Sequence, residues 1–134
     1  MSVRVERRRL VARGDLPGSN GGIYNPGAIL TRGSIVLLCR REIDYRFTTV
    51  VFPERITLDA GTLDVVGHRA LLPVGHDGCR IEDFRSIEFE GERLVIHSAV
   101  GRGRIKPVLS RMFEDALEKV DDLDLPLDLA PVEK

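Results

Sequence analysis

The chain has 134 residues, enough for one domain with a single apolar core, and we expect one domain over residues 1–134. Its 20 basic and 21 acidic side chains give a net charge of −1, which argues against nucleic acid or an anionic membrane surface as a partner. No apolar stretch approaches the ~18 residues that a membrane span needs, and the first residues lack the apolar core of a signal peptide, so we expect a cytoplasmic protein.

The first 22 residues are not expected to carry the chemistry. Several arginines between positions 4 and 13 alternate with apolar residues, a pattern that favours a solvated strand face over a phosphate-binding stripe. Residues 14–22 are rich in glycine, proline and asparagine and predict a long loop.

Strand-type sequence follows in four segments, residues 28–30, 35–40, 47–52 and 64–71, with prolines after the last two. Four antiparallel strands in about 50 residues make one blade-sized sheet, and we assign this first unit to residues 23–73.

The pattern restarts in a second unit at residues 81–131, with strands expected at 85–89, 93–99 and 105–109. Apolar residues between positions 109 and 120 then fall at helical spacing, with Ser110 as a candidate N-cap, and predict a short amphipathic helix over residues 111–120.

The two units contain matched segments 58 positions apart, which begin at Asn25 and Asp83. Each segment runs from polar residues into a short apolar stretch, turns at Gly33 or Gly91, and enters a longer apolar strand. A repeat of this length is typical of propeller blades. We therefore predict a mainly β protein of propeller-like antiparallel blades with a short C-terminal helix.

The sequence Glu82-Asp83-Phe84-Arg85 places two carboxylates and a guanidinium at the start of a predicted strand. Asp83 and Arg85 share one side of a regular strand, so the arginine could orient the carboxylate as a proton donor or bind a substrate oxygen. A structural ion pair has the same pattern. Arg40, at the end of an apolar strand, is either a binding residue or an arginine that reaches to solvent.

Other chemistry-bearing residues give weaker signals. His76, Asp77 and Cys79 lie in one turn, but no second cluster stands at ligand spacing, so no metal site is expected. Cys39 and Cys79 fit no disulfide pattern and suit a reducing compartment. Arg102 and Arg104 lie in a tight glycine-rich turn that is typical of a hairpin tip.

With these motifs in view, the chain resembles the five-bladed β-propeller family of β-mannoside phosphorylases and hydrolases, glycoside hydrolase family 130. In that family a blade opens with an Asn-Pro-Ala/Gly-Ala-Ile run and a strand that ends in arginine, as in residues 25–29 and Arg40 here. The next blade begins Glu-Asp-Pro-Arg, where this chain has residues 82–85. The resemblance covers roughly residues 22–131 and implies an N-terminal two-blade portion or a shortened relative.

The resemblance implies that Asp83 is the general acid of a glycoside cleavage, with Asn25 and Arg40 on the mannose hydroxyls. Glu82 and Arg85 would complete the substrate-binding set. Inorganic phosphate is the possible co-substrate, no other cofactor is implied, and Arg102 or Arg104 is the nearest match to a phosphate ligand.

An alternative is a non-catalytic carbohydrate-binding or assembly module. Phe84 stands where the family has proline, and no catalytic base is identifiable in the chain. Two blades cannot close a ring, and they leave exposed sheet edges. We therefore expect a homo-oligomer or a complementing chain.

Overall fold

The computed structural model describes residues 9–11, 16, 21–101 and 103–123, which form nine β-strands and no helix. The strands are β1 (Ile23–Thr31), β2 (Ser34–Tyr45), β3 (Thr48–Asp59), β4 (Val65–Ala70), β5 (Leu72–Val74), β6 (Arg80–Phe89), β7 (Glu92–Gly101), β8 (Arg104–Phe113) and β9 (Ala116–Asp122). Accordingly, these residues contain no helix able to span a membrane.

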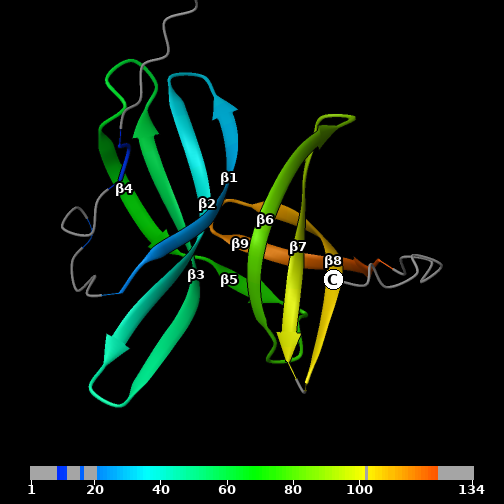
Figure 1. Ribbon diagram of the computed structural model, residues 1–134. Helices are drawn as coiled ribbons and strands as arrows, with labels where there is room; N and C mark the ends of the chain where they lie inside the picture. The colour runs from blue at the N-terminus through cyan, green and yellow to red at the C-terminus, as the bar shows by residue number, and fades with distance from the viewer. Residues whose placement is uncertain (1–8, 12–15, 17–20, 102, 124–134) are drawn as a thin grey trace, which may run out of the picture.

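The strands form two sheets (Figure 1). The first sheet is an antiparallel meander in the order β1-β2-β3-β4, and the second has the order β5-β9-β8-β7-β6, in which only β5 is parallel to its neighbour. Tight turns join β1 to β2 and β6 to β7, and in both turns a glycine takes positive φ, 77° at Gly33 and 79° at Gly91. The predicted mainly β class with antiparallel sheets is confirmed.

The predicted helix over residues 111–120 is wrong, because this segment is the hairpin of β8 and β9. Glu114, with a φ of 40°, lies in the turn between the two strands. Along β8, buried Val108, Ser110 and Met112 alternate with more exposed residues, as in a strand that buries one face. A two-residue turn between two such strands places apolar residues at a spacing that imitates a helix, and Ser110 is a buried strand residue instead of a cap.

The two predicted units can be compared with the two sheets. The four strands of the first sheet lie within residues 23–73, but β5, which begins at Leu72, pairs with β9 and belongs to the second sheet. Residues 124–131 of the predicted second unit lie outside the described residues.

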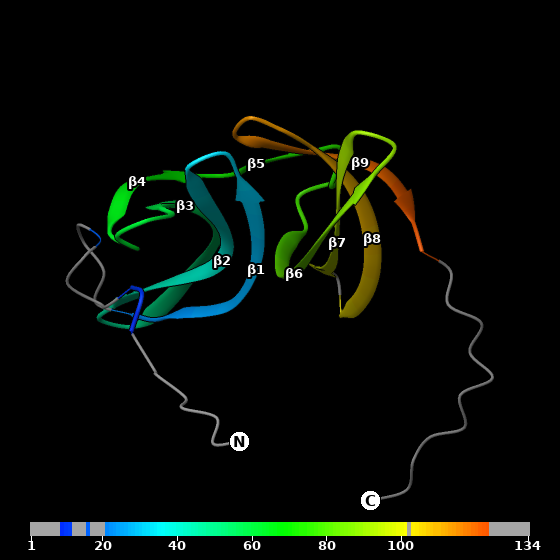
Figure 2. The ribbon, with the colours of Figure 1, turned by 90° about the horizontal axis from the view of Figure 1, so that it is seen from above.

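The 58-residue repeat is visible in the backbone. β1 has a bulge between Tyr24 and Gly27, and β6 has one between Glu82 and Arg85, at positions that correspond 58 residues apart. β1 and β6 lie side by side and run in the same direction (Figures 1 and 2). They belong to different sheets, so side-chain packing and not a hydrogen-bond ladder holds them together.

Two apolar clusters stabilise this arrangement. The larger lies between the sheets and brings Val36 and Leu38 of β2 together with Phe84 and Val95 of the second sheet. The smaller covers the opposite face of the first sheet, where Leu16 packs among residues that include Leu37, Cys39, Ile56 and Leu58. As a result, β2 is buried on both faces, whereas only alternate residues of β7 are buried.

The close approach of β1 and β6 depends on Gly27. A Cβ atom at this position would lie 2.8 Å from the carbonyl oxygen of Phe84 and 3.0 Å from its carbonyl carbon. Both atoms belong to the backbone of β6 and cannot move out of the way as a flexible side chain would.

We expect Gly27→Ala to separate β1 from β6 and to lower the free energy of unfolding by about 1–3 kcal/mol, as overpacking does elsewhere. Gly67→Ala is the matched control, because a Cβ at Gly67 of β4 would meet no atom within 4 Å. Urea unfolding of both variants measures the difference, and equal stabilities would contradict the close approach.

Candidate functional site

The polar residues of the two bulges meet where β1 and β6 lie side by side. We call Tyr24, Asn25, Arg40, Glu82 and Asp83 the bulge cluster. β1 supplies the first two residues, β2 supplies Arg40, and β6 supplies the two carboxylates.

Asn25 and Asp83 are equivalent residues of the repeat, and they contact each other. The side-chain amide of Asn25 donates a hydrogen bond to the carboxylate of Asp83. Both residues have positive φ, 49° and 61°, a conformation that asparagine and aspartate tolerate better than other non-glycine residues. Strained backbone of this kind concentrates at functional sites. The contact between two strained polar residues therefore makes this part of the fold a candidate functional site.

Arg40 is the cation of the bulge cluster. It donates a hydrogen bond to Glu82 at 2.8 Å and forms an ion pair with Glu42 at 3.3 Å. The hydrogen bond to Glu82 is the main reason that the pKa of Arg40 is raised, and Glu42 and Asp83 also favour the charged guanidinium. Arg40 is therefore held by carboxylates of the chain, and it does not extend freely into solvent.

Tyr24 was not identified from the sequence. The Arg40 guanidinium lies over its ring, 5.0 Å from the centroid, and the tyrosine is 42 % exposed. Residues 24 and 40 are directly opposed on β1 and β2. The position of Tyr24 just before the Asn25 motif was the signal in the sequence that could have identified it. An exposed aromatic ring beside a fixed cation adds a flat apolar surface to the polar group.

Glu82 and Arg85, the other two residues expected to bind substrate, both make contacts within the chain. Glu82 is buried and ion-paired with Arg40 and Arg80, which is the contact set of a structural anchor. Arg85 is exposed, and its guanidinium donates to the carbonyl of the preceding residue at 2.7 Å. Because the bulge interrupts the strand alternation, Asp83 and Arg85 do not act as the same-side pair of a regular strand.

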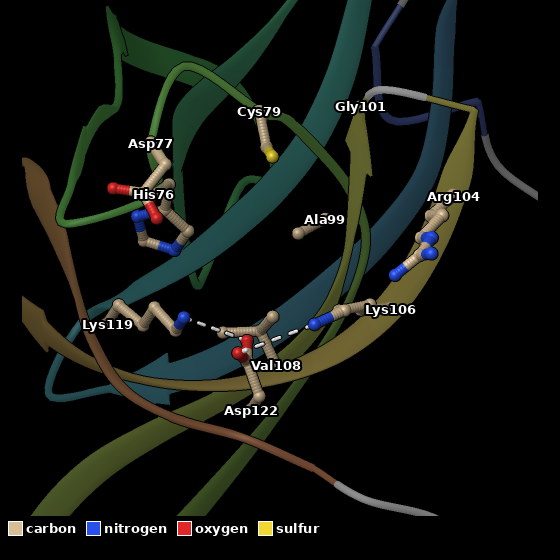
Figure 3. A pocket seen from close by; sticks show the side chains of 10 residues that line it. All are labelled: His76, Asp77, Cys79, Ala99, Gly101, Arg104, Lys106, Val108, Lys119 and Asp122. Carbon is tan, nitrogen blue, oxygen red and sulfur yellow. Dashed lines mark ion pairs between the residues drawn. The ribbon is translucent and has the colours of Figure 1, made fainter.

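Arg104 lies away from the bulge cluster, and Arg102 lies outside the described residues. Arg104 lies on β8, two strands from β6, where it is opposite Gly101 of β7. Asp83 lies in the bulge of β6, beside residues 96–98 of β7. Arg104 lines a different cavity of about 250 Å³ on the second sheet, shown in Figure 3.

That cavity carries both signs of charge. Lys119 and Lys106 point toward Asp122, at 2.8 Å and 3.8 Å, and His76 and Cys79 lie on the opposite side (Figure 3). The contact with Lys119 lowers the pKa of Asp122, so the carboxylate stays charged and offsets the lysines. The cavity has charged and apolar lining residues, and Asp83 is not among them.

A buried polar group, which we call the histidine cluster, lies beside this cavity. Ser110 Oγ is 2.8 Å from Nε2 of His97 and 3.1 Å from Nε2 of His76, and the two histidine nitrogens are 3.2 Å apart. Burial lowers the pKa of His97 to about 4, with a further contribution from His76, and burial also lowers the pKa of His76. Both rings therefore remain neutral at pH 7; they lie against each other, and the His97 ring also lies beside the Phe84 ring.

Metal and thiol chemistry have little support in the described part of the chain. It contains no group of three or more histidine, cysteine, aspartate or glutamate side chains placed to hold a metal ion. Cys39 is buried, and burial together with the nearby Glu54 raises its pKa to about 12. Its thiol is consequently protonated and unreactive at neutral pH.

Comparisons with known proteins gave no relatives: no family model, no curated protein and no solved structure matches this chain.

The histidine cluster predicts a specific pH dependence of stability. The unfolded chain takes up a proton on His97 near pH 6.5, whereas the folded protein resists it down to about pH 4. Stability should be complete above pH 6.5 and should fall by about 3 kcal/mol as the pH drops toward 4.

His97→Gln should remove most of this slope, since glutamine does not titrate. Urea unfolding between pH 7 and 4 measures the slope for both proteins. A slope in the variant equal to that of the wild type would show that His97 is not its source.

Proposed function

We propose that the chain acts on β-mannosides or similar glycans, with the bulge cluster as the sugar-binding site and Asp83 as the proton donor. The observation that carries the proposal is the contact between Asn25 and Asp83, two strained residues at equivalent positions of the repeat. The β-mannoside class comes from the resemblance of the two bulge motifs to the mannoside phosphorylase and hydrolase family.

The chemistry of the cluster suits a sugar. Hydroxyl groups both donate and accept hydrogen bonds, and they are bound by carboxylates, amides and guanidinium groups in combination. Asn25 and Asp83 supply the first two groups at a half-exposed surface, and Arg40 supplies the third. Tyr24 adds an exposed ring against which the apolar face of a sugar can pack.

In this proposal Asp83 protonates the glycosidic oxygen as the bond to the anomeric carbon breaks, directly or through a sugar hydroxyl. Water or inorganic phosphate attacks the anomeric carbon from the opposite face, which inverts its configuration. The attacking group needs a base or a basic pocket of its own. Glu42 and Glu82, the other carboxylates around Arg40, are both ion-paired with it.

These ion pairs favour a second candidate, a carbohydrate-binding module without cleavage activity. Among the described residues around Asp83, neither of these carboxylates is free to act as a base, and Arg104 lies on another part of the sheet. The same cluster would then bind the glycan, and Asp83 would accept a hydrogen bond from a hydroxyl instead of transferring a proton.

One series of aryl β-mannosides separates the two candidates. With a poor leaving group, Asp83→Asn should reduce turnover about 10²–10⁴-fold, with or without added phosphate, because the acid is lost. With a dinitrophenyl leaving group, which needs no proton, the variant should lose far less activity. Glu88→Gln, an exposed carboxylate on the same strand, is the matched control and should retain activity.

Binding measured by calorimetry completes the test. Mannoside binding without cleavage, abolished by Arg40→Ala, would support the binding module and reject the enzyme. Equal loss of activity with both leaving groups would reject Asp83 as the acid. If neither binding nor cleavage is detected with any mannoside or related glycan, both candidates are wrong.

A further inference from the structure

The second sheet has an apolar face that no part of the described chain covers. We call it the outer face. It is formed by three directly opposed pairs on β6, β7 and β8, namely Ile87 with Leu94, Ile96 with Leu109, and Val100 with Ile105. It points away from the first sheet, because Val95 on the other side of β7 belongs to the apolar cluster between the sheets. Figure 2 shows β7 and β8 on the side of the molecule remote from the first sheet.

The equivalent face of the first sheet is covered, as a comparison of the two units shows. Ile96 and Ile87 correspond to Leu38 and Ile29 of the first sheet, 58 residues earlier. Leu38 is fully buried and Ile29 is 8 % exposed, since the second sheet covers them. Ile87 is 47 % exposed, and Ile96 is only half-buried. The same position in the repeat is therefore covered by a β-sheet in one unit and uncovered in the other.

The outer face also has the composition of an interface. Ile105 at its margin is 71 % exposed, and exposed apolar residues that adjoin one another commonly mark a contact surface. Two arginines at its margins are paired within the chain, Arg80 with Glu82 and Arg111 with Glu92, and Arg85, directly opposite Ile96, donates a hydrogen bond to the carbonyl of Phe84. A partner can therefore cover the face without burying an unpaired arginine from these pairs.

A second copy of the chain can offer only certain faces for this contact. The face of its first sheet that points away from the second is occupied by Leu16, with Leu10 and Val11 packed beside it. Among the described residues, the apolar sheet face that remains open in a second copy is the outer face itself. Two identical faces pack against each other across a twofold axis, so the assembly is complete with two copies.

We propose that the protein forms a dimer in which the outer faces of two second sheets pack against each other as a β-sandwich, centred on Ile96. The argument for this contact does not use the proposed activity, so the dimer can be tested separately from any activity on glycans. It joins the sheets through their faces and does not need the edge pairing that the sequence suggested.

The test is the mass of the full chain in solution, measured by light scattering during size-exclusion chromatography over a range of concentrations. We expect twice the 14.9 kDa of one chain. Ile96→Lys and Ile105→Lys each place a charge in the contact and should weaken the dimer roughly thirtyfold or more. Val66→Lys is the matched control, since Val66 is 62 % exposed on β4 of the other sheet, and it should remain dimeric.

The outcomes separate cleanly. A wild-type monomer at all concentrations would overturn the proposal, and so would a dimer that survives Ile105→Lys or dissociates with Val66→Lys. Species that grow beyond two copies would indicate head-to-tail stacking and would also overturn it. Circular dichroism of each variant checks its folding, and the highly exposed Ile105 gives a variant that should fold even if Ile96→Lys does not.

Discussion

The close approach of β1 to β6 is the constraint on which the rest of the structure depends. Strands of two different sheets lie side by side here without a shared ladder, so the contact must come from packing and from a few polar bonds. Gly27 permits it, because any side chain there would meet the backbone of Phe84. Ser86 strengthens it with a 2.7 Å hydrogen bond to the carbonyl of Ala28, its own repeat equivalent. The same approach places Phe84 in the core between the sheets and Asp83 at the surface.

The two bulges turn this structural contact into a candidate site. In a regular strand, Asp83 would alternate with its neighbours and point along one face of the sheet. The bulge breaks the alternation and lets Asp83 meet Asn25. Glu82 beside it is drawn inward and anchors Arg40. One local irregularity, repeated in each unit, thus supplies both the exposed polar pair and the ion pair that supports it.

The repeat explains the surface as well as the site. The second strand of the first unit, β2, is buried on both faces, because the second sheet covers one face and Leu16 covers the other. Among the described residues, the second sheet has a neighbour on one side only, so its outer face stays apolar and open. A stack of sheets needs something over its last face, and the proposed dimer supplies that cover with an identical face.

The sequence by itself located every strand except β5 and β9, and it determined the antiparallel class and the 58-residue repeat, because alternation, turn glycines and matched motifs are local signals. It also selected Asn25, Arg40 and Asp83, since polar residues at strand ends stand out against apolar neighbours. Only the tertiary structure decided that these residues meet, that Glu82 is an anchor and that Arg104 lies elsewhere. Such outcomes depend on bulges and on the packing of β1 against β6, which join residues far apart in the chain. The false helix at residues 111–120 has the same origin: a two-residue turn is decided by pairing between β8 and β9, and spacing along the chain cannot reveal it.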